Sequence, residues 1–192
     1  MAPRPVSEHP QDPRLHVYTG DGKGKTTACI GLAVRAVGAG RRVWMIQFDK
    51  GFDGMNEHYA ERKVLRTFPL LRLDATGCER IRPDGTFRFG VTPPDLEESS
   101  RALSLAREAV RSPDYDLVIL DEVLSAQQYR LIREEDILEL LEDWRREGRA
   151  ELVLSGRTKL QSVLDAADLV TEMRKVKHYF DAGVPAREGI EY

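Results

Sequence analysis

Hydrophobic positions along the chain form short continuous runs, separated by longer stretches in which apolar residues recur every three or four positions. Short runs are typical of strands buried on both faces, and periodic stretches are typical of amphipathic helices. Their alternation predicts an α/β fold, a mostly parallel sheet with helices on both faces. The predicted strands are residues 15–19, 41–48, 70–74, 114–122, 151–156 and 168–176, and the predicted helices are residues 25–37, 95–111, 132–147 and 159–167.

Glycine and proline mark several of the predicted helix ends. Gly38 and Gly40 predict the end of the helix at residues 25–37. Pro94 and Asp95 predict the beginning of the helix that runs to residue 111.

Residues 75–94 interrupt the alternation with a turn-rich excursion. The segment contains several glycines and prolines, including the turn sequence Pro83-Asp84-Gly85. A long loop inside a compact domain is usually functional or mobile. One interpretation is a small hairpin that places Phe87 and Phe89 on one side.

The length and composition are those of an ordinary single domain. The 192 residues, 41% of them hydrophobic, are enough for one buried core, so residues 15–192 are predicted to form one domain. Residues 1–14 are rich in proline and charge, which predicts a flexible lead-in.

Charge and cysteine content narrow the expected partners. The formal net charge of -3 gives no basic footprint for a nucleic-acid backbone. The sequence has no run of about 18 apolar residues, and its beginning lacks the apolar core of a signal peptide. Cys29 and Cys78 form no disulfide framework or metal motif. We therefore expect a cytoplasmic protein that binds small molecules and neither nucleic acid nor a membrane.

The sequence TGDGKGKTT at residues 19–27 lies between a predicted strand and a predicted helix, which is the context of a phosphate-binding loop. Its glycines permit positive φ and bring backbone N–H groups towards an anion. Lys25 is placed to reach phosphate oxygens, and the hydroxyl of Thr26 is placed to bind Mg²⁺. The competing interpretation is a glycine-rich turn that only caps the helix. Three residues, instead of the usual four, separate Gly20 from Gly24.

A second lysine, Lys23, lies inside this loop. Additional positive charge suits a site that stabilises a whole polyphosphate as a leaving group. An exposed, solvated lysine is the other interpretation.

The apolar run LVILDE ends in Asp121 and Glu122, which resembles a Walker B element. An acidic residue at the carboxyl end of a parallel strand, near a phosphate loop, is where a Mg²⁺ ligand is required. A helix N-cap has the same local appearance. The four histidines show no metal-ligand spacing.

The sequences TGDGKGKTTA, RRVWMIQFDKG, VILDE and SGRTKLQSVLDAADLVTEMRKVKHYFDAGVPAREGIEY extend over most of the chain. With them the chain resembles the ATP:corrinoid adenosyltransferases of the cob(I)yrinic acid a,c-diamide type. The family's phosphate loop has the same shortened spacing. The resemblance implies a P-loop NTPase-like (RecA-like) fold in which a Co(I) corrinoid attacks the 5′ carbon of ATP and triphosphate leaves, with Mg²⁺ or Mn²⁺ as cofactor. It also implies a homodimer and a flavoprotein reductant.

The same resemblance assigns roles to individual residues. Lys25, Lys23 and Glu122 are implied to be catalytic, and Thr26 and Glu122 to be metal ligands. The implied ATP-binding residues are Gly20, Asp21, Gly22, Lys23, Gly24, Lys25, Thr26, Thr27 and Arg157.

One segment departs from the family. Related enzymes carry aromatic residues soon after ATG, where they help displace the lower axial ligand of cobalt, but this chain reads CERIRPDGTFRF there. Phe87 and Phe89 either take over that role or form the sides of a hairpin. In the C-terminal sequence, a structural role is expected for His178 and Phe180.

Two other functions are compatible with the phosphate loop. A P-loop kinase or ATPase would attack the terminal phosphate and would need a base for the attacking hydroxyl or water. A nucleotide-dependent corrinoid-binding module would bind both ligands without turnover.

Overall fold

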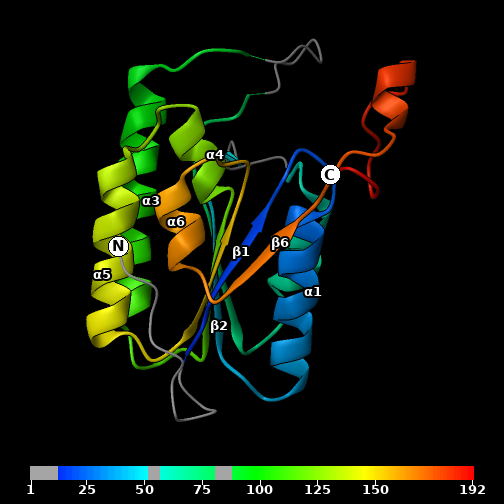
Figure 1. The fold of residues 1–192 in the computed structure, drawn as a ribbon. Helices are drawn as coiled ribbons and strands as arrows, with labels where there is room; N and C mark the ends of the chain where they lie inside the picture. Colours follow the sequence, from blue (N-terminus) through cyan, green and yellow to red (C-terminus); the bar gives the residue numbers. More distant parts are fainter. Residues whose placement is uncertain (1–12, 52–56, 81–87) are drawn as a thin grey trace.

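A computed structural model of the chain describes residues 13–51, 57–80 and 88–192. Its centre is a six-stranded sheet in the order β3-β2-β4-β5-β1-β6, in which every neighbouring pair of strands is parallel (Figure 1). The α/β prediction is confirmed. The strands are β1 Leu15–Thr19, β2 Val43–Gln47, β3 Leu71–Ala75, β4 Leu117–Asp121, β5 Glu151–Ser155 and β6 Leu169–Glu172. The helices are α1 Lys25–Gly38, α2 Ala60–Leu65, α3 Pro93–Arg111, α4 Val123–Gln128, α5 Glu134–Glu147, α6 Gln161–Ala166 and the 3₁₀ turn η1 Tyr179–Ala182.

Helices cover both faces of the sheet, and alternate residues of each central strand face opposite layers (Figure 1). In β2, Trp44 and Ile46 pack in the core layer that includes α3 and α5, whereas Val43 and Met45 pack in the layer that includes α1 and α2. Because both faces are covered, β2 and β4 are buried along their whole length. This explains why their sequences are continuous apolar runs.

Strand β6 closes one edge of the sheet and is exposed at all four positions. It pairs only with β1 and then continues into residues 173–192, here named the C-terminal segment. Figure 1 shows this segment beyond the carboxyl end of β1. The last part of the chain therefore reaches the edge of the sheet where the phosphate loop begins.

Several predicted boundaries were wrong. Helix α1 includes Gly38 as its last residue, with Ala39 as the C-cap and Gly40 following at a φ of 77°. Helix α5 begins at Glu134, two residues later than predicted, and neither α2 nor α4 was predicted. The predicted strand at residues 168–176 is shorter, because residues after Glu172 leave the sheet.

Helix α3 begins at Pro93 because the preceding residue caps it. The N–H and hydroxyl of Thr92 donate to Asp95 Oδ2 at 2.8 and 2.6 Å. The guanidinium of Arg88 adds two hydrogen bonds to the same carboxylate, at 2.8 and 2.6 Å. A buried Asp95 thus fixes both the start of α3 and the end of the excursion at residues 75–94.

The predicted hairpin falls largely outside the described residues, as does Phe87. On either side of the gap, the Arg88 N–H donates to the Arg80 carbonyl at 2.7 Å. The Phe89 side chain is 84% exposed. Residues 1–12 of the predicted lead-in are also outside the described chain, so the domain division stays a prediction. In the part of the chain that is described, no helix has both the length and the apolar character needed to span a membrane.

Candidate active site

The phosphate loop, residues 20–26, follows β1 and includes the first two residues of α1, so that it lies at the predicted junction of strand and helix. Gly20 and Gly24 have φ values of 103° and 119°, a region that glycine enters without steric cost. Gly24 is the N-cap of α1, and no side chain caps this helix. Its first N–H groups and the positive end of its dipole are therefore available to an anion.

Lys25 folds back over the loop. Its Nζ donates to the carbonyls of Gly20 and Gly22 at 2.9 and 2.8 Å, and the residue is only 7% exposed. Burial lowers the pKa of Lys25, the negative charge of Glu122 opposes this, and the positive charge of Arg157 adds to it. The ammonium lies inside the loop, where phosphate oxygens can replace the two carbonyls as acceptors.

The glycines of the loop have a second role that the sequence did not reveal. A Cβ on Gly20 would lie 2.3 Å from the Met173 carbonyl oxygen, and one on Gly22 would lie 2.7 Å from it. The Gly22 N–H donates to this carbonyl at 2.6 Å. The Gly22 N–H therefore binds the C-terminal segment in this structure, and the assignment of Gly22 to the ATP-binding residues stays a prediction.

Thr26 lies in a buried polar cluster with Asp121 and Lys50. The Thr26 hydroxyl donates to Asp121 Oδ1 at 3.1 Å, and Lys50 Nζ is 2.7 Å from both Thr26 Oγ1 and Asp121 Oδ2. The Ser155 hydroxyl donates to Asp121 Oδ1 at 2.6 Å. Asp121 therefore has hydrogen-bond partners on both carboxylate oxygens and is fully buried.

The charges of this cluster stabilise one another. Burial alone would raise the pKa of Asp121, but Lys50 and the hydrogen bonds from Ser155 and Thr26 hold it below its usual value. Burial alone would lower the pKa of Lys50, but Asp121 and Glu122 raise it. Sequence analysis missed Lys50. The available signal was a lysine shortly after a buried strand, at the edge of the sheet where parallel strands place their sites.

Glu122 follows β4 in a left-handed conformation, with a φ of 62°. Its N–H donates to Ser155 Oγ at 2.9 Å, which holds the residue at the end of the strand. Within the described chain its carboxylate makes no hydrogen bond or ion pair, and it lines the cavity that contains Thr26. No cluster of three or more His, Cys, Asp or Glu side chains suited to a metal occurs among the described residues. A hydroxyl and one unpaired carboxylate fit Mg²⁺, which usually takes few protein ligands together with phosphate oxygens and water.

Arg157 follows β5 on the neighbouring side of the cavity. Its N–H donates to Ser125 Oγ at 2.9 Å, next to Gly156, whose φ is 132°. The side chain is exposed and lines the cavity together with Thr27. A guanidinium in this position is able to bind phosphate oxygens.

The C-terminal segment supplies one wall of the site, which sequence analysis did not anticipate. Lys23 Nζ donates to the Tyr179 hydroxyl at 3.1 Å, the Ile190 carbonyl at 2.9 Å and Glu191 Oε1 at 2.6 Å. Asp21 Oδ1 accepts a hydrogen bond from the Lys175 N–H at 3.0 Å. The segment's contribution to the cavity lining is Lys175, His178, Phe180, Asp181, Gly189, Ile190, Glu191 and Tyr192.

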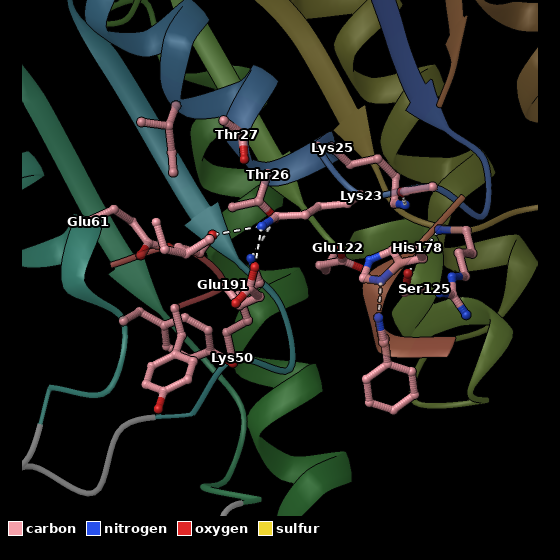
Figure 2. A pocket seen from close by; sticks show the side chains of 18 of the residues that line it. Lys23, Lys25, Thr26, Thr27, Lys50, Glu61, Glu122, Ser125, His178 and Glu191 are labelled. Atoms are coloured by element: carbon pink, nitrogen blue, oxygen red, sulfur yellow. Dashed lines mark hydrogen bonds and ion pairs between the residues drawn. The ribbon is translucent and has the colours of Figure 1, made fainter. Parts of the chain in front are cut away.

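These elements surround one cavity of about 980 Å³ (Figure 2). The structure brings together in its lining every predicted ATP-binding residue except Gly20, together with Glu122. Lys50 and Tyr59 also line the cavity. Phe89 is not part of the lining. The cavity is at the upper end of the size range of small-molecule sites.

Comparison with known proteins finds similarity to one family along nearly the whole chain. Residues 11–192 match the family described as ATP:corrinoid adenosyltransferase BtuR/CobO/CobP. The Corrinoid adenosyltransferase CobA of Salmonella typhimurium is 35% identical over 177 residues, which cover 92% of this chain and 84% of that protein. The Corrinoid adenosyltransferase of Escherichia coli K12 is 34% identical over 185 residues, 95% of this chain and 88% of that protein. That of Pseudomonas aeruginosa is 30% identical over 178 residues, 93% and 83%. The chain therefore belongs to the ATP:corrinoid adenosyltransferase family.

Proposed function

We propose that the protein transfers the 5′-deoxyadenosyl group of ATP to the Co(I) centre of a reduced corrinoid and releases inorganic triphosphate. The observation that carries this proposal is a phosphate loop, with Lys25 folded over it and no side chain capping α1, at a large cavity whose described lining contains no cysteine. Both cysteines are outside the lining, and Cys29 is buried with a raised pKa. A substrate that brings its own nucleophile suits such a site.

In the proposed step the electron pair of Co(I) attacks the ribose 5′ carbon. A cobalt–carbon bond forms, the bond from that carbon to the first phosphate oxygen breaks, and triphosphate leaves with the bonding electrons. Lys25, the free amides at the start of α1 and Arg157 are placed to bind the triphosphate. Their positive charges favour the transition state because negative charge increases on the leaving group.

Thr26 and Glu122 are the residues that would hold Mg²⁺ or Mn²⁺ in this site. When bound, the ion supplies positive charge to the phosphate oxygens. Asp121 orients the Thr26 hydroxyl through the hydrogen bond at 3.1 Å, and Lys50 holds Asp121 in place. Asp121 and Lys50 are thus not proposed ligands of the ion; they orient the proposed ligand Thr26.

Other features remain inferences from the resemblance to the family. They are a homodimer and a flavoprotein reductant. A cytoplasmic location is inferred from the cysteine content and the lack of a signal peptide in the sequence. Participation of Phe87 and Phe89 at the lower face of the corrinoid is one of two roles open to these residues, the other being the sides of a hairpin. Phe89 is compatible with contact to a large apolar ligand, because its ring is largely exposed.

The test is an anaerobic reaction of the protein with Mg·ATP and chemically reduced cob(I)alamin. We expect loss of the Co(I) absorption, formation of adenosylcobalamin and release of intact triphosphate. ADP as the product would indicate a kinase or ATPase. Binding of ATP and cobalamin with a persistent Co(I) signal would indicate a binding module. Either result contradicts the proposed function.

A further inference from the structure

The phosphate loop is joined to the C-terminal segment at three consecutive residues. The Gly22 N–H donates to the Met173 carbonyl at 2.6 Å, and Asp21 Oδ1 accepts from the Lys175 N–H at 3.0 Å. The third contact is made by the ammonium of Lys23, which binds groups of Tyr179, Ile190 and Glu191, more than 150 residues away in sequence. The two segments therefore form one unit at the edge of the cavity.

The donor capacity of Lys23 is used entirely in this contact. A lysine ammonium has three N–H bonds, and Lys23 Nζ has three acceptors, at 3.1, 2.9 and 2.6 Å. They are the hydroxyl of Tyr179, the carbonyl of Ile190 and the carboxylate of Glu191.

Glu191 is itself held in place by the C-terminal segment. It accepts hydrogen bonds from the Tyr179 hydroxyl and from the Arg187 N–H and Nε, the last two at 2.8 and 3.2 Å. Hydrogen bonds from Lys23, Tyr179 and Arg187 hold the pKa of Glu191 well below its usual range. The side chain is 15% exposed. Moving Lys23 to another ligand would remove the closest cation from this carboxylate.

Lys25 differs from Lys23 in this respect. Its two acceptors are carbonyls of the loop itself, so that it can exchange them for phosphate oxygens without moving the C-terminal segment. The two loop lysines, which the sequence assigns to the same task, therefore have different surroundings.

The C-terminal segment reaches across to the other side of the site. The ring of Tyr192 stacks on the imidazole of His58, with ring centres 4.1 Å apart and planes at 13°. Tyr59, next to His58, lines the cavity, as do Ile190 and Tyr192. The segment is thus anchored at the phosphate loop and again beside α2, and it forms a wall between these anchors.

We propose that Asp21 and Lys23 are positioning residues, whose side chains hold the C-terminal segment as a wall of the nucleotide site and do not bind the triphosphate. The inference rests on the proposed function insofar as this wall encloses ATP. It revises the sequence-based expectation that both side chains contact the nucleotide.

The experiment compares Lys23→Met, Glu191→Gln and the double variant, with Lys63→Met on the exposed face of α2 as the control. Trypsin cleavage at the basic residues of segment 173–192 is followed by mass spectrometry. Affinity for inorganic triphosphate is measured by calorimetry. Neither measurement requires turnover.

We expect trypsin to cleave the C-terminal segment about tenfold faster in both single variants, because each loses the same charge-assisted hydrogen bond. The double variant should be cleaved no faster than either single variant, because the two residues act through one contact. Triphosphate affinity should fall by less than about threefold in all of them. A tenfold or larger loss of triphosphate affinity in Lys23→Met with none in Glu191→Gln would overturn the proposal. Unchanged cleavage in both single variants would also overturn it.

Asp21 offers a second, conservative comparison. Asp21→Asn keeps an oxygen acceptor for the Lys175 N–H, so trypsin should still cleave the C-terminal segment slowly. Asp21→Ala removes this acceptor, so cleavage should be faster. Equal cleavage of the two variants contradicts the role assigned to Asp21. If the wild-type protein binds inorganic triphosphate but forms no adenosylcobalamin, the proposed function is contradicted. The positioning role assigned to Asp21 and Lys23 is not contradicted by that result.

Discussion

Lys50 Nζ lies 2.7 Å from Asp121 Oδ2, and this ion pair joins the end of β4 to the loop after β2 beneath the proposed nucleotide site. The carboxylate is fully buried and the lysine side chain is 12% exposed. A buried charge that loses its partner is costly, whereas a pair replaced as a whole costs much less.

Lys50→Met should therefore destabilise the protein by about 3–5 kcal/mol, because it leaves Asp121 buried without its cation. Lys50→Met combined with Asp121→Asn should recover part of this loss. The measurement is chemical denaturation of wild type, both single variants and the double variant. Equal stabilities of Lys50→Met and the double variant would show that the pair is not coupled as the geometry indicates.

Lys25→Met should reduce the rate of the Co(I) reaction by about 10²–10³-fold, the usual effect of removing one preorganised group that stabilises transition-state charge. Single-turnover kinetics with cob(I)alamin under anaerobic conditions measure this rate. The C-terminal segment should stay protected from trypsin, because Lys25 contacts only the loop. A variant with unchanged kinetics contradicts the role proposed for Lys25.

Gly20→Ala should destabilise the protein and weaken nucleotide binding. The new Cβ would lie 2.3 Å from the Met173 carbonyl oxygen, at a φ that is also strained for alanine. Gly31→Ala is the matched control, since it lies inside α1 with open space around the position, and should stabilise by about 0.5–1 kcal/mol. Thermal denaturation with and without ATP separates the two effects. A neutral Gly20→Ala would mean that the segment after β6 does not approach the loop so closely.

Asp95→Asn should cost about 1–2 kcal/mol near neutral pH, because it weakens the capping box of α3 and the pairing with Arg88. Hydrogen bonds from Arg88 keep the pKa of Asp95 below its usual range, despite burial. A depressed folded-state pKa gives stability that is present above the unfolded value, about 3.9, and is lost as the pH falls further. The stability difference between the two proteins should therefore shrink below about pH 4, which urea titrations at several pH values measure.

Phe89→Ala should leave the stability within about 0.5 kcal/mol of wild type, because the ring is exposed. If Phe87 and Phe89 exclude the lower ligand of cobalt, alanine at either position should slow the reaction that begins from Co(II) and a reductant. The reaction that begins from preformed Co(I) should be unaffected. Equal effects on both reactions would place these residues elsewhere in the mechanism.

The sequence predicted the parts of the fold whose signals are local. The strand ending in Asp121 is a continuous apolar run, and the glycine-rich loop before Lys25 has a distinctive spacing. Helix α4 was missed because it is only six residues long and follows β4 without a capping side chain. Such a segment has no periodicity long enough to detect.

The missed parts of the site depend on distant contacts. Lys50 acquires its role only when β2 pairs with β4, and Glu191 only when β6 brings the C-terminal segment to the phosphate loop. In isolation, the last residues of the chain read as a polar loop with aromatic side chains. Chain topology, which the alternation of strands and helices leaves undetermined, brings these groups together.

The position of β1 between β5 and β6 also bears on protein synthesis. Strand β1 is translated before either of its partners, which do not exist until residues 151–172 have been made. At about 5–20 residues per second, this delay is roughly 8–30 s. During that time β2, β3 and β4 are able to pair with one another, while β1 has an apolar sequence and no neighbour. The nascent chain therefore has a period in which β1 is apolar and unpaired, and the phosphate loop can take its final shape only after Met173 has been made.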